Sequence, residues 1–413
     1  MLPLRGGHQV ELLQGGQAYF DSLIQAIGDS QHEVRLETYI FHLDPSGTRV
    51  AQALVGAAAR GVAVFLTMDG VGTPRLPLEW AAQFDSHGVS WHIFSPLGRL
   101  GVFIPSRWRR LHRKLCVVDG QVAFCGGINV LDDFVDPNHG TLGEPRLDFA
   151  LRVTGPLVHE VRETMAQFWW RLQLASDVNA REFPAVWREL QASLRKALAG
   201  RESATDPSNG RASWLPSGAG TRGARARLVL RDNLRNRRKI EHAYLDAIGS
   251  ARQEVVVANA YFLPGASLRR ALVRAARRGV RVRLLLQGRY EYFMQFHAAR
   301  PVYGALLAAG VEIHEYAASF LHAKVAVVDM HWATVGSSNL DPLSLLLARE
   351  ANIVVDDEVF ARDLRARLET AMAQCGQSLD ARAFANRPWR QRVLDRLAYG
   401  VMRLSLFLMG RRY

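Results

Sequence analysis

The spacing of apolar residues along the chain predicts helices and strands in alternation. Two segments with helical character, residues 48–60 and 267–278, are each followed by a glycine, Gly61 or Gly279, and then directly by the apolar runs VAVFLTM and VRVRLLL. A glycine is a common terminator just after a helix, and a short apolar run bounded in this way is typical of a buried strand. The pattern therefore predicts α/β layers around a mostly buried sheet.

The same order of elements occurs twice. AIGDSQHEVRLETYIF at residues 26–41 matches AIGSARQEVVVANAYF at 247–262, and AAARGVAVFLTMDG at 57–70 matches AARRGVRVRLLLQG at 275–288. A long connection and a strand pair follow in each copy. Self-similarity of this kind indicates a duplicated unit. We therefore expect an α/β fold of two duplicated domains, each a mixed β-sheet flanked by helices, packed as a pseudo-dimer.

A segment between the copies has the composition of a linker. Residues 200–226 are rich in Gly, Ser, Pro and charge, and we set the boundary near residue 215. The predicted organisation is a first domain at 1–205, a linker at 206–226, a second domain at 227–385 and an amphipathic basic tail at 386–413.

The tail carries apolar residues at helical spacing. These positions are Trp389, Val393, Leu397, Val401, Leu404 and Leu408, and the run is interrupted by Arg392, Asp395, Arg396 and Arg403. Such a helix suits a membrane interface, but the same stripe is typical of a helix that packs on its own domain, and the sequence leaves both open. We find no signal peptide, and no apolar run reaches the roughly 18 to 20 residues of a spanning helix.

The chain is strongly basic, with 52 Lys and Arg against 39 Asp and Glu and a formal charge of +13. This suits an anionic partner, whether nucleic acid, an anionic membrane surface or a phosphate-bearing substrate. Two basic runs, residues 106–114 and 225–239, either dock anionic groups or form solvated faces. The three cysteines lack metal-ligand spacing and are too few for a disulfide framework, which favours a reducing compartment.

Both copies carry one polar motif with identical spacing. A lysine, an aspartate and an asparagine follow a histidine by two, seven and seventeen residues, as His112, Lys114, Asp119 and Asn129 and again as His322, Lys324, Asp329 and Asn339. Residues two apart in a strand share a face, so each histidine and lysine point the same way. A cluster of imidazole, ammonium and amide donors suits an anionic oxygen, and phosphate fits best.

Two such clusters facing one another predict catalysis rather than binding alone. One neutral histidine can attack phosphorus while the other, protonated, donates to the leaving alkoxide, and the first becomes covalently phosphorylated. Each histidine should have a carboxylate on its distal nitrogen, and Asp148 and Glu350 are the candidates. We expect no metal and no other cofactor, because two lysines and two asparagines supply the charge stabilisation.

The two stretches HRKLCVVDGQVAFCGGIN and HAKVAVVDMHWATVGSSN resemble the paired HxKxxxxD motifs of the phospholipase D superfamily. The resemblance covers nearly the whole chain, and within the superfamily it is greatest to bacterial cardiolipin synthases of the short type without N-terminal transmembrane spans. It implies two phospholipase D-like domains with the active site between them. It also implies transfer of a phosphatidyl group through a phosphohistidine to phosphatidylglycerol, which forms cardiolipin and releases glycerol, or ethanolamine if phosphatidylethanolamine is the donor.

The resemblance also assigns roles to residues of the two motifs. It implies His112 as nucleophile and His322 as acid and base, with Lys114 and Lys324 beside them and Asn129, Ser337 and Asn339 as phosphate-binding residues. Asp119 and Asp329 belong to the catalytic signature, yet their turn positions predict a structural part. Gly127 stands where the superfamily usually has serine, so one hydroxyl contact to phosphate is expected to be missing. Ala348 and Arg349 stand where an Asn-Leu pair is expected.

The implied partners are phosphatidylglycerol, other anionic or zwitterionic phospholipids and a membrane surface, with no nucleic acid. The implied location is peripheral, at the cytoplasmic face of the bacterial inner membrane. Two alternatives stay open at this point. The same site could hydrolyse its substrate, as a phospholipase, phosphodiesterase or nuclease. A non-catalytic anion-binding or membrane-adaptor module is the other, although neither copy lacks the His or the Lys.

Overall fold

A computed structural model of the chain describes residues 3–98, 105–137, 139–179, 223–232, 236–290, 293–341 and 348–408. The described residues up to Arg162 and from Gly223 onward form one compact unit, and Glu163 opens a second unit. Both histidine motifs belong to the first unit. No helix in these described ranges is long and apolar enough to cross a membrane.

The first copy alternates helices and strands as its periodicity predicts. Its elements are β1 (Arg5–Gln14), α1 (Gly15–Gly28), β2 (Glu33–Thr38), α2 (Pro45–Ala59), β3 (Ala63–Asp69), α3 (Leu78–His87), β4 (Ser90–Phe94), the 3-10 turn Pro105–Trp108, β5 (Arg110–Leu111), β6 (Lys114–Val118), β7 (Val122–Gly126), β8 (Val135–Asp136), β9 (Gly140–Thr141), β10 (Phe149–Thr154) and α4 (Leu157–Asn179).

The second copy repeats this order. Its elements are β11 (Ala224–Arg231), α6 (Lys239–Ser250), β12 (Glu254–Asn259), α7 (Ala266–Arg277), β13 (Arg281–Gln287), α8 (Phe293–Leu307), β14 (Glu312–Tyr316), β15 (Lys324–Val328), β16 (Trp332–Gly336), β17 (Ala348–Asp356), α10 (Glu358–Cys375), β18 (Gly376–Ser378), α11 (Ala381–Ala385) and α12 (Trp389–Leu408). The predicted linker lies outside the described residues as far as residue 222, and β11 occupies its last three positions.

The predicted ends of the paired helices α2 and α7 agree with the structure to within a few residues. The Asp44 carboxylate accepts a hydrogen bond from the Gly47 amide at 2.8 Å, which caps the start of α2. At the other ends, Gly61 and Gly279 both have φ of +87°, a left-handed conformation that glycine adopts without steric cost. The next strand can therefore start at once in both copies.

One continuous sheet runs through both copies. Its strand order is β18-β14-β13-β12-β15-β16-β17-β11-β1-β10-β7-β6-β2-β3-β4. Within each copy two parallel pairs meet an antiparallel hairpin, for example β2 and β3 in parallel and β2 and β6 antiparallel. The two half-sheets join where β1 pairs with β11, with Arg5 opposite Ala226 and His8 opposite Ala224. The expected mixed α/β architecture of two similar halves is confirmed.

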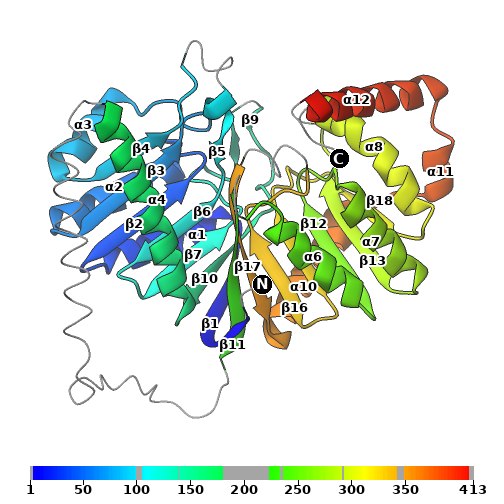
Figure 1. Ribbon diagram of the computed structural model, residues 1–413, viewed down its shortest axis with the longest axis horizontal. Coiled ribbons are helices and arrows are strands. Elements are labelled where there is room, and N and C mark those ends of the chain that lie inside the picture. Colours follow the sequence, from blue (N-terminus) through cyan, green and yellow to red (C-terminus); the bar gives the residue numbers. More distant parts are fainter. Residues whose placement is uncertain are drawn as a thin grey trace. The chain divides into compact units, whose positions relative to one another are not determined.

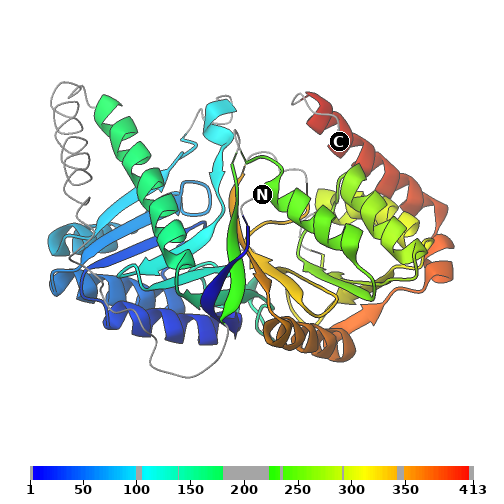
Figure 2. The same ribbon diagram turned by 60° about the horizontal axis from the view of Figure 1, so that its bottom comes forward.

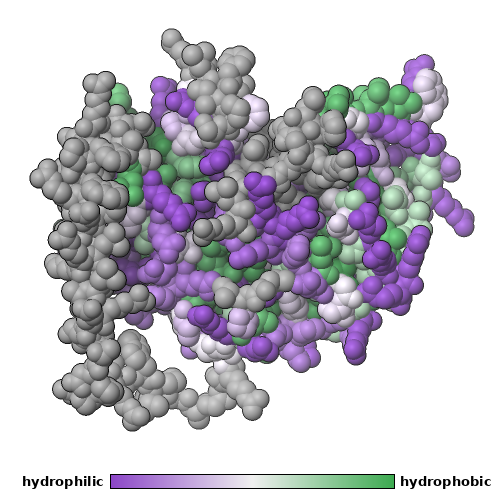
Figure 3. Space-filling view, in the orientation of Figure 1, coloured by the Kyte–Doolittle hydropathy of each residue, from purple (hydrophilic) through white to green (hydrophobic). Residues whose placement is uncertain are grey.

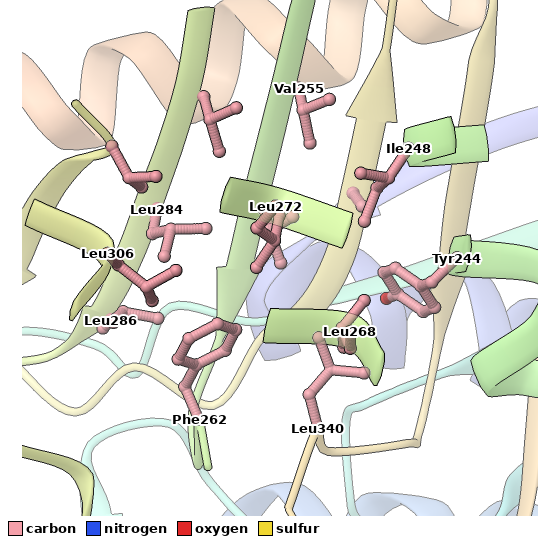
Figure 4. Packing of buried hydrophobic residues seen from close by; sticks show 14 of the residues in the cluster. Tyr244, Ile248, Val255, Phe262, Leu268, Leu272, Leu284, Leu286, Leu306 and Leu340 are labelled. Atoms are coloured by element: carbon pink, nitrogen blue, oxygen red, sulfur yellow. The ribbon is translucent and has the colours of Figure 1, made fainter. Parts of the chain in front are cut away.

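Helices cover the two half-sheets (Figures 1 and 2). Figure 2 shows α1 and α2 below the sheet of the first half, and in the second half α6 and α7 lie above the sheet and α10 lies below it. Each half has its own buried apolar cluster. In the second half, Tyr244 and Ile248 of α6, Leu272 of α7, Leu284 of β13 and Leu306 of α8 pack together (Figure 4). These two rigid cores hold the strands that carry the histidine motifs.

Candidate active site

The motif aspartates hold the strand hairpins and lie away from the histidines. Asp119 and Asp329 sit at the turns after β6 and β15, with φ of +52° and +49°. The Asp119 carboxylate accepts hydrogen bonds from the amides of residues 31, 32 and 33, each at 2.8 Å. Asp329 does the same with residues 252, 253 and 254 at 2.8, 2.8 and 2.9 Å. Neither lines the cavity between the halves, so their place fits the structural part that their turn positions predict.

Asp119→Ala is expected to lower the free energy of unfolding by about 1–3 kcal/mol, because three amides at the start of β2 lose their acceptor. Activity per folded molecule should stay within about twofold, since the cavity is untouched. Denaturant unfolding of the full chain measures the loss. The matched control is Asp21→Ala, which removes an acid exposed beside Arg49 and should change stability by under about 1 kcal/mol. Loss of activity without loss of stability would contradict the structural role.

Each motif histidine is held by the backbone of the other half. The His112 amide donates to the Arg349 carbonyl at 3.0 Å, where β5 runs parallel to the start of β17. In the same way the His322 amide donates to the Leu147 carbonyl at 2.9 Å. The acceptors immediately precede Glu350 and Asp148. The backbone crossing therefore delivers each carboxylate to the histidine of the opposite half.

The side chains form two crossed pairs. His112 Nδ1 lies 3.0 and 3.1 Å from the two carboxylate oxygens of Glu350. His322 Nδ1 lies 2.7 Å from Asp148 Oδ2. An imidazole that donates from Nδ1 to a carboxylate presents Nε2 to its surroundings with a fixed orientation. Both histidines therefore point a usable nitrogen into the space between the halves.

The electrostatics of the first pair favour an ionised carboxylate. Burial by itself raises the pKa of Glu350, but the charge and hydrogen bond of His112, with Lys114 and Ser337, bring that pKa below its usual value. Burial also lowers the pKa of His112, an effect that Glu350 opposes. At neutral pH His112 is therefore a neutral imidazole that donates to an anion, and its Nε2 carries a lone pair.

In the second pair, His322 and Asp148, the carboxylate is easier to protonate than in the first. Burial raises the pKa of Asp148 to about 7, against the opposing charge of Lys324. Burial, together with Lys324 and Lys114, lowers the pKa of His322 well below its usual value. Because the two groups share one hydrogen bond, the proton that enters near neutral pH belongs to the pair. This pair can accept and return a proton at working pH, which is what an acid–base catalyst requires.

The two lysines lie directly behind the histidines. Lys114 Nζ donates to the His112 carbonyl at 2.7 Å, and Lys324 Nζ donates to the His322 carbonyl. Both side chains are buried, and burial lowers the pKa of Lys114 to about 7. The charge of Lys324 also lowers the pKa of Lys114, so a phosphate that enters the site would favour the charged form of both lysines.

A cavity of about 830 Å³ connects the two halves. Both histidines line it, with Asn129, Asn339 and Asp148. Asn129 Oδ1 accepts from the Ile40 amide at 3.2 Å, which leaves its NH₂ group for a ligand. Among the residues that the structure describes, no group of three His, Cys, Asp or Glu side chains is arranged to hold a metal ion.

Ser337 occupies a different place from the one expected. It is fully buried, does not line the cavity, and donates from Oγ to Glu350, while the Ala351 amide donates to Oγ at 3.1 Å. Its counterpart Gly127 leaves room for Asp148, because a Cβ there would stand 2.3 Å from Asp148 Oδ1. The glycine thus makes space for a carboxylate, and the serine orients the other carboxylate.

A second set of polar residues lies around the cavity, of which the sequence indicated only Arg110, as part of the basic run 106–114. Arg110 lines it and bonds to Asp69, a fully buried acid at the end of β3, at 3.0 Å. Arg146 lines it too, 3.1 Å from Asp136. The sequence carries a signal for each acid–arginine contact. Asp69 ends a parallel strand, and ligand-binding sites commonly lie at the carboxyl ends of such strands. Arg146 lies two residues before Asp148, so in extended backbone the two side chains point to the same side.

Arg113 departs from both interpretations of the first basic run. It is buried and donates to Glu37 Oε1 at 2.8 Å, so it neither faces solvent nor offers its charge to a ligand. Ala348 lines the cavity where an asparagine is expected. A small side chain there widens the space beside the two histidines.

Comparison with known proteins gives one consistent result. A family model described as "Cardiolipin synthase, PLD-like domain" matches residues 23–142 and 244–372. The chain is 34% identical to cardiolipin synthase B of Escherichia coli (strain K12), over 98% of this chain and 90% of that protein. It is 30% identical to cardiolipin synthase A of Pseudomonas putida (strain GB-1), over 87% and 67%.

Among solved structures, the phosphatidylserine synthase of Haemophilus influenzae Rd KW20 superposes with a TM-score of 0.66. The match covers 98% of this chain and 96% of that one, with 14% sequence identity. At this identity the likeness concerns the fold alone.

Proposed function

Because the chain belongs to the cardiolipin synthase family of phospholipase D-like proteins, we propose that it transfers a phosphatidyl group to phosphatidylglycerol and forms cardiolipin. The observation that carries the proposal is the pair of crossed histidine–carboxylate contacts on one cavity. Two histidines with unequal partners can divide nucleophilic attack from proton transfer. A site that only bound phosphate would not need the second histidine.

In the first step His112 Nε2 attacks the phosphorus of the donor lipid. His112 Nδ1–H donates a hydrogen bond to Glu350. The positive charge that develops on the imidazole therefore faces a carboxylate 3.0 Å away. As the N–P bond forms, the bond from phosphorus to the leaving oxygen breaks, and His322 gives that oxygen its proton. The products are phosphatidyl-His112 and free glycerol, or ethanolamine if the donor is phosphatidylethanolamine.

In the second step a hydroxyl of phosphatidylglycerol attacks the same phosphorus. His322 takes the proton of that hydroxyl, a new P–O bond forms and the N–P bond breaks, so both histidines return to their initial states. Lys114 and Lys324 supply buried positive charge beside the reacting phosphate, and the amides of Asn129 and Asn339 donate to its oxygens. The chain's own groups thus supply the charge stabilisation that these steps need.

The pH dependence of transfer is expected to be bell-shaped, with loss on the alkaline side above about pH 7. There the His322–Asp148 pair, in which Asp148 has a pKa of about 7, gives up the proton that the leaving group needs, and Lys114, whose pKa is also about 7, loses its positive charge. On the acid side the rate falls when His112 becomes protonated, which happens below its usual pKa because burial lowers it. Initial rates in detergent-dispersed substrate measure the profile. A flat rate from pH 6 to 9 would contradict this division of roles.

The proposed location is peripheral, at the cytoplasmic face of a bacterial inner membrane, where phosphatidylglycerol provides the acceptor. The net charge of +13 suits such an anionic surface. Phospholipids are the proposed partners, and nucleic acid is not.

One assay tests the function. The purified full chain is incubated with phosphatidylglycerol vesicles, with and without phosphatidylethanolamine, and the lipids are identified by mass spectrometry. Cardiolipin with glycerol, or with ethanolamine, supports the proposal and identifies the donor. Phosphatidic acid alone would make the enzyme a hydrolase. Unchanged lipids together with cleaved DNA would overturn the lipid function.

A further inference from the structure

The side of helix α12 that carries Asp395, Ala398 and Met402 faces inward, against α8. Asp395 is 1% exposed, accepts from Arg387 Nη1 at 3.0 Å and lies 2.7 Å from His297 Nδ1. Ala398, one turn later, is buried in the same apolar cluster as α8. Since Asp395 is bonded on both carboxylate oxygens, these contacts fix the rotation of α12 about its own axis.

The apolar stripe of α12 therefore faces outward. Trp389, Leu397, Val401 and Leu404 are 69, 62, 53 and 57% exposed, and Val393 is 43% exposed. Figure 3 shows hydrophobic (green) surface over α12, at the top of the second half. Continuous apolar surface of this kind is uncommon on a protein that meets only water, and it marks an interaction site. The sequence left open whether the stripe packs on its own domain, and in the structure its residues from Trp389 to Leu404 do not.

The charges beside the stripe all have one sign. Arg392, Arg396 and Arg403 are exposed along one edge of it, and Arg390 is exposed in the first turn. Asp395 is the one acid in α12, and it is buried in an ion pair. The outer face thus combines apolar and cationic groups, which complements a surface that is apolar below and anionic above. An antiparallel two-fold contact between two copies of this face would instead bring arginines of one copy beside arginines of the other.

The position of α12 suits access to the cavity. Arg110 of β5 lines the cavity, and in Figure 1 β5 and α12 lie toward the same edge of the molecule, at the top of the view. Tyr290, just before α8, and Phe293, its first residue, are 51 and 48% exposed. They add apolar surface near the α8 end of this edge.

We propose that the outer face of α12 docks the protein on an anionic phospholipid surface, with the helix axis parallel to the bilayer plane. The stripe enters the region between headgroups and acyl chains, and the arginines contact headgroup phosphates. The identity of the occupant rests on the proposed function, because the substrates of that reaction lie in such a surface. The docking itself rests on the exposure and charge of α12.

The test is vesicle co-sedimentation of the full chain. Leu397→Glu is expected to weaken binding to vesicles of equal phosphatidylglycerol and phosphatidylcholine by at least about tenfold, because a carboxylate replaces an inserted side chain. Arg396→Gln should weaken it by about fivefold and reduce its salt dependence. The matched control is Val359→Glu, which places the same charge at a 79% exposed valine on α10 and should leave binding unchanged.

Transfer activity in detergent micelles separates docking from catalysis. Leu397→Glu should keep it within about twofold of the unmodified chain, because α12 does not line the cavity. If Leu397→Glu binds vesicles as well as Val359→Glu does, the docking proposal is overturned. It is also overturned if the unmodified chain is a dimer that Leu397→Glu dissociates while vesicle binding stays unchanged. If the unmodified chain binds vesicles and Leu397→Glu does not, but neither makes cardiolipin, docking stands and the proposed function fails.

Discussion

Replacing His112 by alanine is expected to lower phosphatidyl transfer by at least about 10⁴-fold and to abolish any phosphorylated form of the enzyme. The reason is that His112 would form the bond to phosphorus, and the Ser337 hydroxyl, which also contacts Glu350, does not line the cavity. The measurement is an acid quench after mixing with lipid donor, followed by mass spectrometry of the His112 peptide.

His322→Ala is the informative partner of this variant. With a phosphatidyl ester of p-nitrophenol, whose leaving group needs no proton, the phosphorylated enzyme should still form. It should then accumulate, because no base activates the acceptor alcohol. His331→Ala, an exposed histidine close to the second motif, is the control and should react as the unmodified chain does. Accumulation in His112→Ala and none in His322→Ala would exchange the two roles.

Glu350→Gln is expected to slow phosphorylation of the enzyme by about 10³- to 10⁴-fold with little change in fold. Glu350 Oε2 lies within hydrogen-bond distance of both His112 Nδ1 and Ser337 Oγ, and Oε1 lies 3.0 Å from His112 Nδ1. If the glutamine oxygen takes the place of Oε2 and keeps the contacts to His112 and Ser337, the glutamine NH₂ group takes the place of Oε1. It then faces the Nδ1–H of His112, and two donors oppose one another. The imidazole then favours hydrogen on Nε2, and the lone pair that attacks phosphorus is lost.

The release of p-nitrophenol in a single turnover measures this effect. Asp148→Asn is the comparison, because it alters the partner of His322. With a leaving group that needs no proton, it should slow this first step by less than about tenfold. Glu358→Gln, an exposed carboxylate at the start of α10, controls for the loss of a charge. Equal slowing by Glu350→Gln and Asp148→Asn would contradict separate roles for the two pairs.

Besides the difference between Asp148 and Glu350 themselves, the two pairs differ in the residue that lies behind each carboxylate. Ser337 orients Glu350, whereas Gly127 leaves the space that the Asp148 carboxylate fills. The sequence shows a serine in one copy and a glycine in the other, and we expected the serine to contact phosphate. The side chain instead points to a carboxylate thirteen residues later. Its direction depends on how β16 pairs with β17, which no local pattern reports.

The sequence by itself determined the local parts of this protein. Period-two alternation puts each motif histidine and lysine on one strand face, turn positions keep the motif aspartates away from the cavity, and internal repetition predicts two similar halves. It also supplied Asp148 and Glu350 as candidate partners. These features depend on residues near one another in the chain, where strand and turn geometry leaves few choices.

Only the tertiary structure decided which distant groups meet. His112 contacts a carboxylate 238 residues away and His322 one 174 residues away, because the two half-sheets join through β1 and β11 and cross at β5 and β17. The outward direction of the α12 stripe has the same kind of cause, since Asp395 turns inward to meet His297 and Arg387. A periodic pattern shows that a helix has two sides. Which side is buried depends on the partner that the rest of the chain places against it.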